Sequence, residues 1–147
     1  KPVFFGLIPS GPVLMCGEMK RRNFLTGGED LALRYNEGDT TTQKTLRQLA
    51  GYMHFYKTEH SVLSTYDRTW MAQLTSEGHL LISEAFKSET IGHQSTLNAL
   101  FYTVSLARES VRLGTWAKNR PELQPVTKTV IASPETSGSK CGSGGES

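Results

Sequence analysis

The sequence has few cysteines, little net charge and no long apolar run, and each of these shortages narrows the class of protein. The 147 residues carry a formal net charge of +2, which permits a nucleic-acid partner without demanding one. No apolar stretch approaches the roughly 20 residues of a membrane-spanning helix, so we expect no membrane partner. The 2 cysteines, Cys16 in an apolar stretch and Cys141 in a Ser/Gly-rich one, are poorly placed for a disulfide. An intracellular protein, nuclear or cytoplasmic, therefore fits best.

Spacings that bind zinc or nucleotide phosphates are also missing. Among the 4 histidines, His54 and His60 do not form the close pair of a zinc site, and no cysteine pair accompanies them. Gly27 and Gly28 lack the lysine that follows in a phosphate-binding loop. The chain starts at Lys1 without a signal-peptide pattern. We therefore expect it to be part of a longer protein, with an N-terminal element of the domain lying before Lys1.

What the sequence does contain is an alternation of patterns typical of strands and helices. A composition with 37% hydrophobic and 20% charged residues is ordinary for one globular domain. Asp39 or Thr40, with Gln43 in a capping-box position, marks the start of a helix. The patterns predict a hairpin of strands over 3–8 and 13–20, a loop with a helical turn over 30–35, a helix over 40–57, strands over 61–66, 69–74 and 79–83, and a helix over 95–114.

This order of elements favours the α/β class, with a mixed (α+β) sheet flanked by helices. The helix over 40–57 would carry the chain across one face of the sheet by a right-handed crossover. Residues 1–120 are expected to form the domain, and residues 121–147 a flexible Ser/Gly/Pro-rich linker or tail. The buried stripe of the last helix is predicted to consist of Leu97, Leu100, Phe101, Val104, Ala107 and Val111.

The stretch 13–20 has the pattern of a buried strand that ends in charged residues. Apolar side chains on both faces through Cys16 are typical of a strand inside a layered core. Glu18 and Lys20 would point to the same side of that strand. There the carboxylate can hold a hard cation, and the ammonium can stabilise a developing negative charge. The alternative is a strand that simply leaves the core into the basic turn 20–22.

The helix over 40–57 is predicted to bring polar side chains to the same region. Gln48 and Tyr52 lie on the flank of its apolar face, so they are expected to point toward the rim of the sheet. Gly51 is unfavourable inside a helix, and a close approach to the sheet is one reason to tolerate it. The apolar face itself is formed by Leu46, Leu49, Ala50 and Met53.

Three stretches in this order resemble the PD-(D/E)XK nuclease superfamily, and more closely the nuclease-like domains of fungal Crinkler-type and kinase-linked proteins. They are Gly17-Glu18-Met19-Lys20, Gln48-Leu49-Ala50-Gly51-Tyr52 and Val62-Leu63-Ser64-Thr65-Tyr66-Asp67-Arg68-Thr69-Trp70. The Gln48-to-Tyr52 spacing is similar to that of the RecB-type branch, and the whole resemblance covers residues 1–108. It implies a restriction-endonuclease-like core and a kinase-type domain elsewhere in the parent chain.

The activity that this resemblance implies is metal-dependent cleavage of DNA phosphodiester bonds. Glu18 would be the ligand of Mg²⁺ or Mn²⁺, and Lys20 would position or activate the attacking water. Gln48 would orient substrate or water, with Tyr52 in support. Mg²⁺ suits such a site because it keeps several waters, needs only one or two carboxylates and polarises phosphate.

One position departs from the family pattern. The aspartate of the preceding strand is expected after a proline, but Pro2 is followed by Val3, which cannot bind a metal. Either the chain is an inactive relative or another acid substitutes. The candidate substitutes are Glu29, Asp30, Glu37 and Asp39.

Basic and aromatic residues supply a candidate nucleic-acid surface. Arg21, Arg22, Arg47 and Arg68 are expected to contact phosphates beside Lys20, although a solvated turn explains the first of these equally well. The aromatic residues of the helix flank, Tyr52, Phe55 and Tyr56, could stack on bases or pack in the core. Three functions remain open: a DNA endonuclease, a non-catalytic nuclease-like module that binds nucleic acid or a protein, and a structural adaptor.

Overall fold

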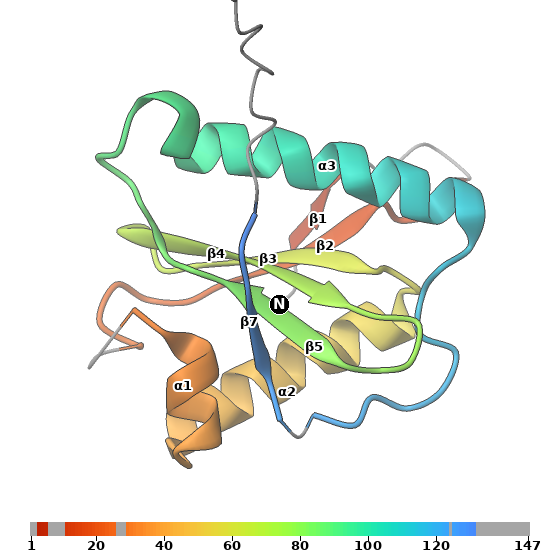
Figure 1. Ribbon diagram of the computed structural model, residues 1–147, viewed down its shortest axis with the longest axis horizontal. Coiled ribbons are helices and arrows are strands. Elements are labelled where there is room, and N and C mark those ends of the chain that lie inside the picture. Colours follow the sequence, from red (N-terminus) through yellow and green to blue (C-terminus); the bar gives the residue numbers. More distant parts are fainter. Residues whose placement is uncertain (1–2, 6–10, 26–28, 124, 132–147) are drawn as a thin grey trace, which may run out of the picture.

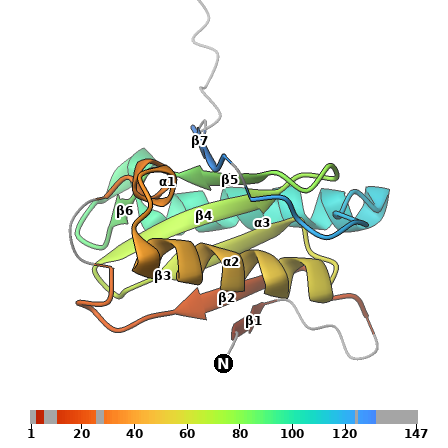
Figure 2. The same cartoon turned by 90° about the horizontal axis from the view of Figure 1, so that it is seen from below.

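A central sheet between two layers of helices forms the body of the protein (Figures 1 and 2). The structure, a computed structural model, describes residues 3–5, 11–25, 29–123 and 125–131. Helix α3 covers one face of the sheet, and α1 and α2 cover the other. The elements are β1 (Val3–Phe5), β2 (Met15–Met19), α1 (Leu31–Asn36), α2 (Thr40–Phe55), β3 (His60–Ser64), β4 (Arg68–Leu74), β5 (Leu80–Ser83), β6 (Phe86–Lys87), the short 3₁₀ helix η1 (Gly92–Gln94), α3 (Thr96–Leu113) and β7 (Thr127–Thr129).

The sheet is mixed, which confirms the predicted α/β class. Its strands lie in the order β1-β2-β3-β4-β5-β7, and β6 pairs with β4. The β2–β3 and β5–β7 pairs are parallel and the other pairs are antiparallel. Parallel neighbours need a long connection, and α2 supplies it between β2 and β3. These two strands consequently end at the same edge of the sheet, where the Lys20 amide donates to the Ser64 carbonyl (2.8 Å).

Alternation along the strands divides the core into two apolar clusters. Cys16, Leu63 and Trp70 belong to the cluster beneath α1 and α2. Met15 and Met71 belong to the smaller cluster beneath α3. Because side chains alternate along a strand, the face that holds Cys16 also holds Glu18 and then Lys20. Trp70 is fully buried, and its indole nitrogen donates to the Glu29 carbonyl (2.9 Å).

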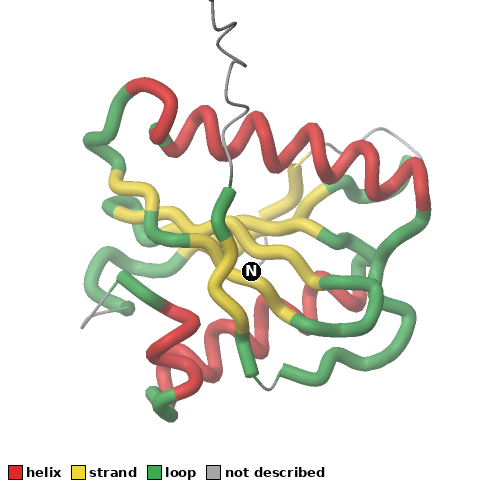
Figure 3. The backbone as a smooth tube through the Cα atoms, in the orientation of Figure 1, coloured by secondary structure: helices red, strands yellow, loops and turns green. Residues whose placement is uncertain are grey.

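The predicted helices are confirmed to within a few residues, with one change in capping. The carboxylate of Asp39 caps α2 by accepting from the Thr42 amide (2.8 Å). The Gln43 side chain does not make the predicted capping-box contact and donates instead to the Tyr35 carbonyl. Ser95 caps α3, which ends at Gly114 with a φ of 68°. None of the helices within the described ranges is both long and apolar enough to cross a bilayer. Figure 3 shows how these helices flank the strands.

The predicted buried stripe of α3 is wrong in part. Leu97 and Phe101 are 61% and 64% exposed, while the small residues Ala99, Thr103 and Ala107 are buried against the sheet. Small side chains let the helix lie close to the strands, and this contact rotates the larger residues outward. Hydrophobicity at helical spacing does not distinguish the two faces when both carry apolar residues.

The predicted division at residue 120 is also wrong, because the chain returns to the sheet after it. Val126 is 2% exposed within the larger core cluster, and β7 extends the sheet beside β5. The Asn36 side chain bonds both backbone groups of Val126, at 2.9 and 3.1 Å. A short strand of polar residues carries little hydrophobic signal, so the Ser/Thr/Pro-rich composition concealed it. Residues 132–147 lie outside the described part.

Two valines of this returning segment provide a matched test of its role. Val126→Ala should lower the free energy of unfolding by about 2 kcal/mol, because it removes a buried side chain from the core. Val130→Ala should leave stability within about 0.5 kcal/mol, since Val130 is 82% exposed. Urea unfolding followed by tryptophan fluorescence measures both. Equal stability of the two variants would show that the segment is not packed as described.

Candidate functional site

Glu18 and Lys20 form an ion pair at the end of β2. The Lys20 ammonium lies 2.8 Å from Glu18 Oε1, and the side chains are 16% and 5% exposed. Glu18 is the last buried residue of the strand, and the exposed Met19 side chain follows on the other face. The carboxylate therefore lies under the sheet rim, and its ammonium partner closes it from solvent.

Helix α2 supplies the other two predicted site residues. Lys20 Nζ donates to Gln48 Oε1 (3.0 Å), and Gln48 Nε2 donates to the Tyr52 hydroxyl (2.9 Å). The structure thus brings together all four predicted site residues in one hydrogen-bonded chain from β2 to α2. Their catalytic roles stay predictions.

Cys16 lies on the same face of β2 as Glu18, two residues earlier in the strand. Its Sγ lies 3.5 Å from the Thr58 hydroxyl, and both side chains are buried. Burial raises the pKa of the Cys16 thiol, so the thiol stays protonated at neutral pH. Cys16 is therefore part of the floor under the site and not a nucleophile in it.

The magnesium site predicted at Glu18 stays a prediction, and three observations bear on it. In the antiparallel pair of β1 and β2, position 3 lies opposite Gly17 and not opposite Glu18. An aspartate at position 3 would therefore be one residue out of register with Glu18. Nowhere in the described ranges do three or more Asp, Glu, His or Cys residues group as a metal site. Glu18 also presents one oxygen to Lys20 and keeps the other buried. A single carboxylate already paired with an ammonium is a poor ligand set for Mg²⁺.

The carboxylates of three of the four acids proposed as substitutes have other partners. Asp30 caps α1 by accepting from the Leu33 amide, and Asp39 caps α2. The pKa of each carboxyl is lowered, that of Asp30 mainly by the Leu33 amide and that of Asp39 mainly by Thr42. Glu29 pairs with Arg68 and Lys87, and Glu37 is the C-terminal cap of α1. Within the described residues, none of these contacts reaches Glu18.

The four predicted phosphate-contacting arginines differ in their surroundings, and Arg47 lines a separate hollow with Tyr35. Arg21 is exposed beside Lys20. Arg22 pairs with Asp67 (3.0 Å) and Arg68 with Glu29 (3.3 Å), so their charges are partly neutralised. The side chain of Arg47 points in a different direction from that of Gln48, because successive residues of a helix are rotated by about 100° around its axis.

Sequence reasoning missed two aromatic side chains at the mouth of the site. Phe24 is 44% exposed and lies under the Lys20 ammonium (5.1 Å to the ring centre), while Tyr66 is 66% exposed. The loops that carry them are joined by the Lys20–Ser64 backbone bond and the Arg22–Asp67 ion pair. Tyr66 has a φ of 70°, a left-handed conformation that is rare for an aromatic residue. The family-like stretch 62–70 contained Tyr66, but nothing in the pattern showed that it would be exposed.

Removing one member of the ion pair should be much worse than removing both. Lys20→Met leaves the Glu18 carboxylate buried and unpaired at pH 7, so it should lower the free energy of unfolding by about 3–5 kcal/mol. The double variant Glu18→Gln/Lys20→Met should recover most of this loss. Lys87→Met, at a 50% exposed ion pair, is the control and should change stability by less than about 1 kcal/mol. A Lys20→Met protein as stable as the control would contradict the buried pair, and urea unfolding decides.

Comparisons with protein-family models, with curated proteins and with solved structures found no match to this chain.

Proposed function

We propose that this chain is a non-catalytic, restriction-endonuclease-like module that binds single-stranded DNA at the edge where β2 and β3 end. The observation that carries the proposal is the pair of exposed aromatic side chains, Phe24 and Tyr66, on two joined loops beside Lys20 and Arg21. Aromatic side chains set among cations are what a sequence-tolerant single-strand site needs, since bases stack on the rings while the cations contact phosphates.

The arrangement favours a flexible single strand over a duplex. Bases of a single strand are unstacked and can reach aromatic rings, whereas those of a duplex are covered by their neighbours. The left-handed backbone at Tyr66 keeps its ring outside the core, which is the kind of local strain found at binding sites. The exposed Arg21 contributes positive charge at the rim, whereas the Lys20 ammonium at the base is paired with Glu18.

Binding without cleavage follows from the state of Glu18. Cleavage through a metal would need the carboxylate to leave Lys20 and to find further ligands, which the described residues do not offer. The pair instead joins the end of β2 to α2 through Gln48. In this proposal the residues that resemble a catalytic set hold the binding loops in place.

A metal-dependent nuclease is the second candidate, and one observation favours it. Glu18 Oε2 is buried without a hydrogen-bond partner among the described residues, as expected of an atom whose ligand is missing. In an active enzyme Glu18 would hold the Mg²⁺, which would polarise the phosphate, and Lys20 would stabilise developing charge. The single carboxylate makes this the weaker reading.

Binding can be tested with a fluorescein-labelled oligodeoxythymidine and fluorescence anisotropy. Phe24→Ala should weaken binding by about 5-fold to 100-fold, as loss of one stacked base does. Tyr66→Asn should act similarly, since asparagine tolerates the left-handed backbone. Phe101→Ala, which removes an exposed ring from α3, is the matched control and should bind like the unmodified protein. An affinity that does not depend on salt concentration, or an equal loss of affinity in all three variants, would refute the site.

Cleavage can be tested separately on supercoiled plasmid with Mg²⁺ or Mn²⁺. We expect no nicking, because the Glu18 carboxylate is paired with Lys20 and belongs to no group of three or more Asp, Glu, His or Cys within the described residues. Nicking that disappears in Glu18→Gln would overturn the non-catalytic proposal and establish the second candidate. Nicking that persists in this variant would indicate a contaminating nuclease, and the protein would then be repurified before the assay is scored.

A further inference from the structure

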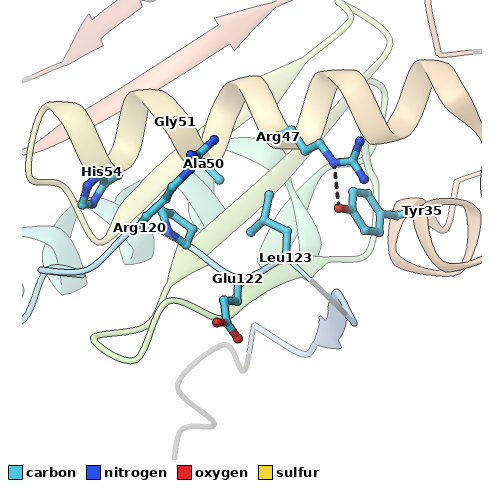
Figure 4. Close-up of a pocket in the computed structure, with 9 residues that line it drawn as sticks. Tyr35, Arg47, Ala50, Gly51, His54, Arg120, Glu122 and Leu123 are labelled. Atoms are coloured by element: carbon cyan, nitrogen blue, oxygen red, sulfur yellow. Dashed lines mark hydrogen bonds between the residues drawn. The ribbon is translucent and has the colours of Figure 1, made fainter.

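A second hollow of the molecule opens between α2 and the segment 120–123 (Figure 4). Its volume is about 680 Å³, within the range of about 300–1,000 Å³ that small-molecule sites occupy. Tyr35 of α1 and His54 of α2 lie toward its two ends. None of the residues that line this groove belongs to the Glu18 site or to its loops.

Two guanidinium groups that have no acidic partner within the described residues line the groove. Arg47 lies over the Tyr35 ring (5.8 Å to its centre), and its Nε donates to the Tyr35 hydroxyl (3.3 Å). This contact orients the side chain, and neither terminal nitrogen has a partner within the described residues. Arg120 is exposed, and it makes no hydrogen bond or ion pair within the described part of the chain. Glu122 is the one acid in the lining, and its carboxylate is directed away from α2.

The floor of the groove is open helix backbone with apolar side chains around it. Gly51 is exposed, and a Cβ built on it would meet nothing within 4 Å, so its predicted approach to the sheet is wrong. Leu123 lines the facing wall, and the buried Ala50 lies beside Gly51 on α2. At one end of the groove, His54 Nδ1 donates to the Ala117 carbonyl (3.1 Å), which fixes the ring.

We propose that this groove binds a small organic phosphate monoester. Two guanidinium groups match the double charge and the several oxygens of a phosphate, which arginine binds through paired hydrogen bonds. From Arg47 to His54 the helix rises about 10 Å, enough for a phosphate and a body the size of a sugar or an aromatic ring. The organic body packs against Leu123 and over the exposed backbone at Gly51. This ligand is distinct from the nucleic acid proposed above and uses other residues.

The proposal is tested by isothermal titration calorimetry with the whole chain and three probes: adenosine monophosphate, p-nitrophenyl phosphate and glucose 6-phosphate. At least one should bind at micromolar to millimolar concentration, more tightly than inorganic phosphate. The corresponding alcohol of that probe (adenosine, p-nitrophenol or glucose) should not bind measurably. Failure of all three esters at millimolar concentration, or equal binding of ester and alcohol, would overturn the proposal.

Two variants connect the binding to the groove. Arg120→Gln should weaken the ester by about 10-fold to 100-fold, the effect of losing a hydrogen bond to a charged group. Arg108→Gln on α3 is the matched control, because Arg108 is also exposed and has no partner within the described residues. Gly51→Leu should fill the groove and abolish binding, yet raise the melting temperature by about 2–4 °C through better helix propensity.

The outcomes separate this groove from the proposed DNA site. Ester binding that survives both Arg120→Gln and Gly51→Leu would place the ligand elsewhere and refute the groove. DNA binding should be unchanged in both variants, whereas Phe24→Ala should leave ester binding intact. A Gly51→Leu protein that is less stable than the unmodified chain would contradict the open space described at that position.

Discussion

The parallel pairing of β2 with β3 is the constraint on which the rest of the structure depends. Two parallel neighbours cannot be joined by a turn, so the chain must cross the sheet, and α2 makes that crossing. The crossing brings Gln48 over the end of β2, where it accepts from Lys20. Lys20 in turn neutralises Glu18, which alternation has placed on the buried face. The loops with Phe24 and Tyr66 meet at this edge for the same reason.

The last described segment has a similar structural consequence on the other side of α2. By returning to the sheet as β7, the chain passes under α2 and closes one wall of the groove with residues 120–123. Val126 anchors this return in the core, and Asn36 holds its backbone. The groove and the edge site therefore share one helix, but they use residues that point in different directions from it, as Arg47 and Gln48 show.

Residues near each other in sequence were the easier part of the candidate site to predict. Glu18 and Lys20 follow from strand alternation, and Gln48 and Tyr52 from helix spacing; the family resemblance joined them, and the structure places all four in one chain of hydrogen bonds. The arginines were harder, because a guanidinium reaches whichever acid the fold brings near. Arg22 pairs with Asp67, and Arg68 pairs with Glu29. No local sequence pattern predicts such partners.

The sequence by itself determined the class of fold, the positions of α2 and α3 and the buried character of β2, because periodicity and capping are local properties of neighbouring residues. Only the tertiary structure decided which face of α3 is buried, that 126–129 joins the sheet, and that Gly51 faces open space. It also decided that the Glu18 carboxylate meets the Lys20 ammonium. Each of these depends on contacts between distant segments, whose energies arise from packing and charge pairing that no stretch of sequence contains alone.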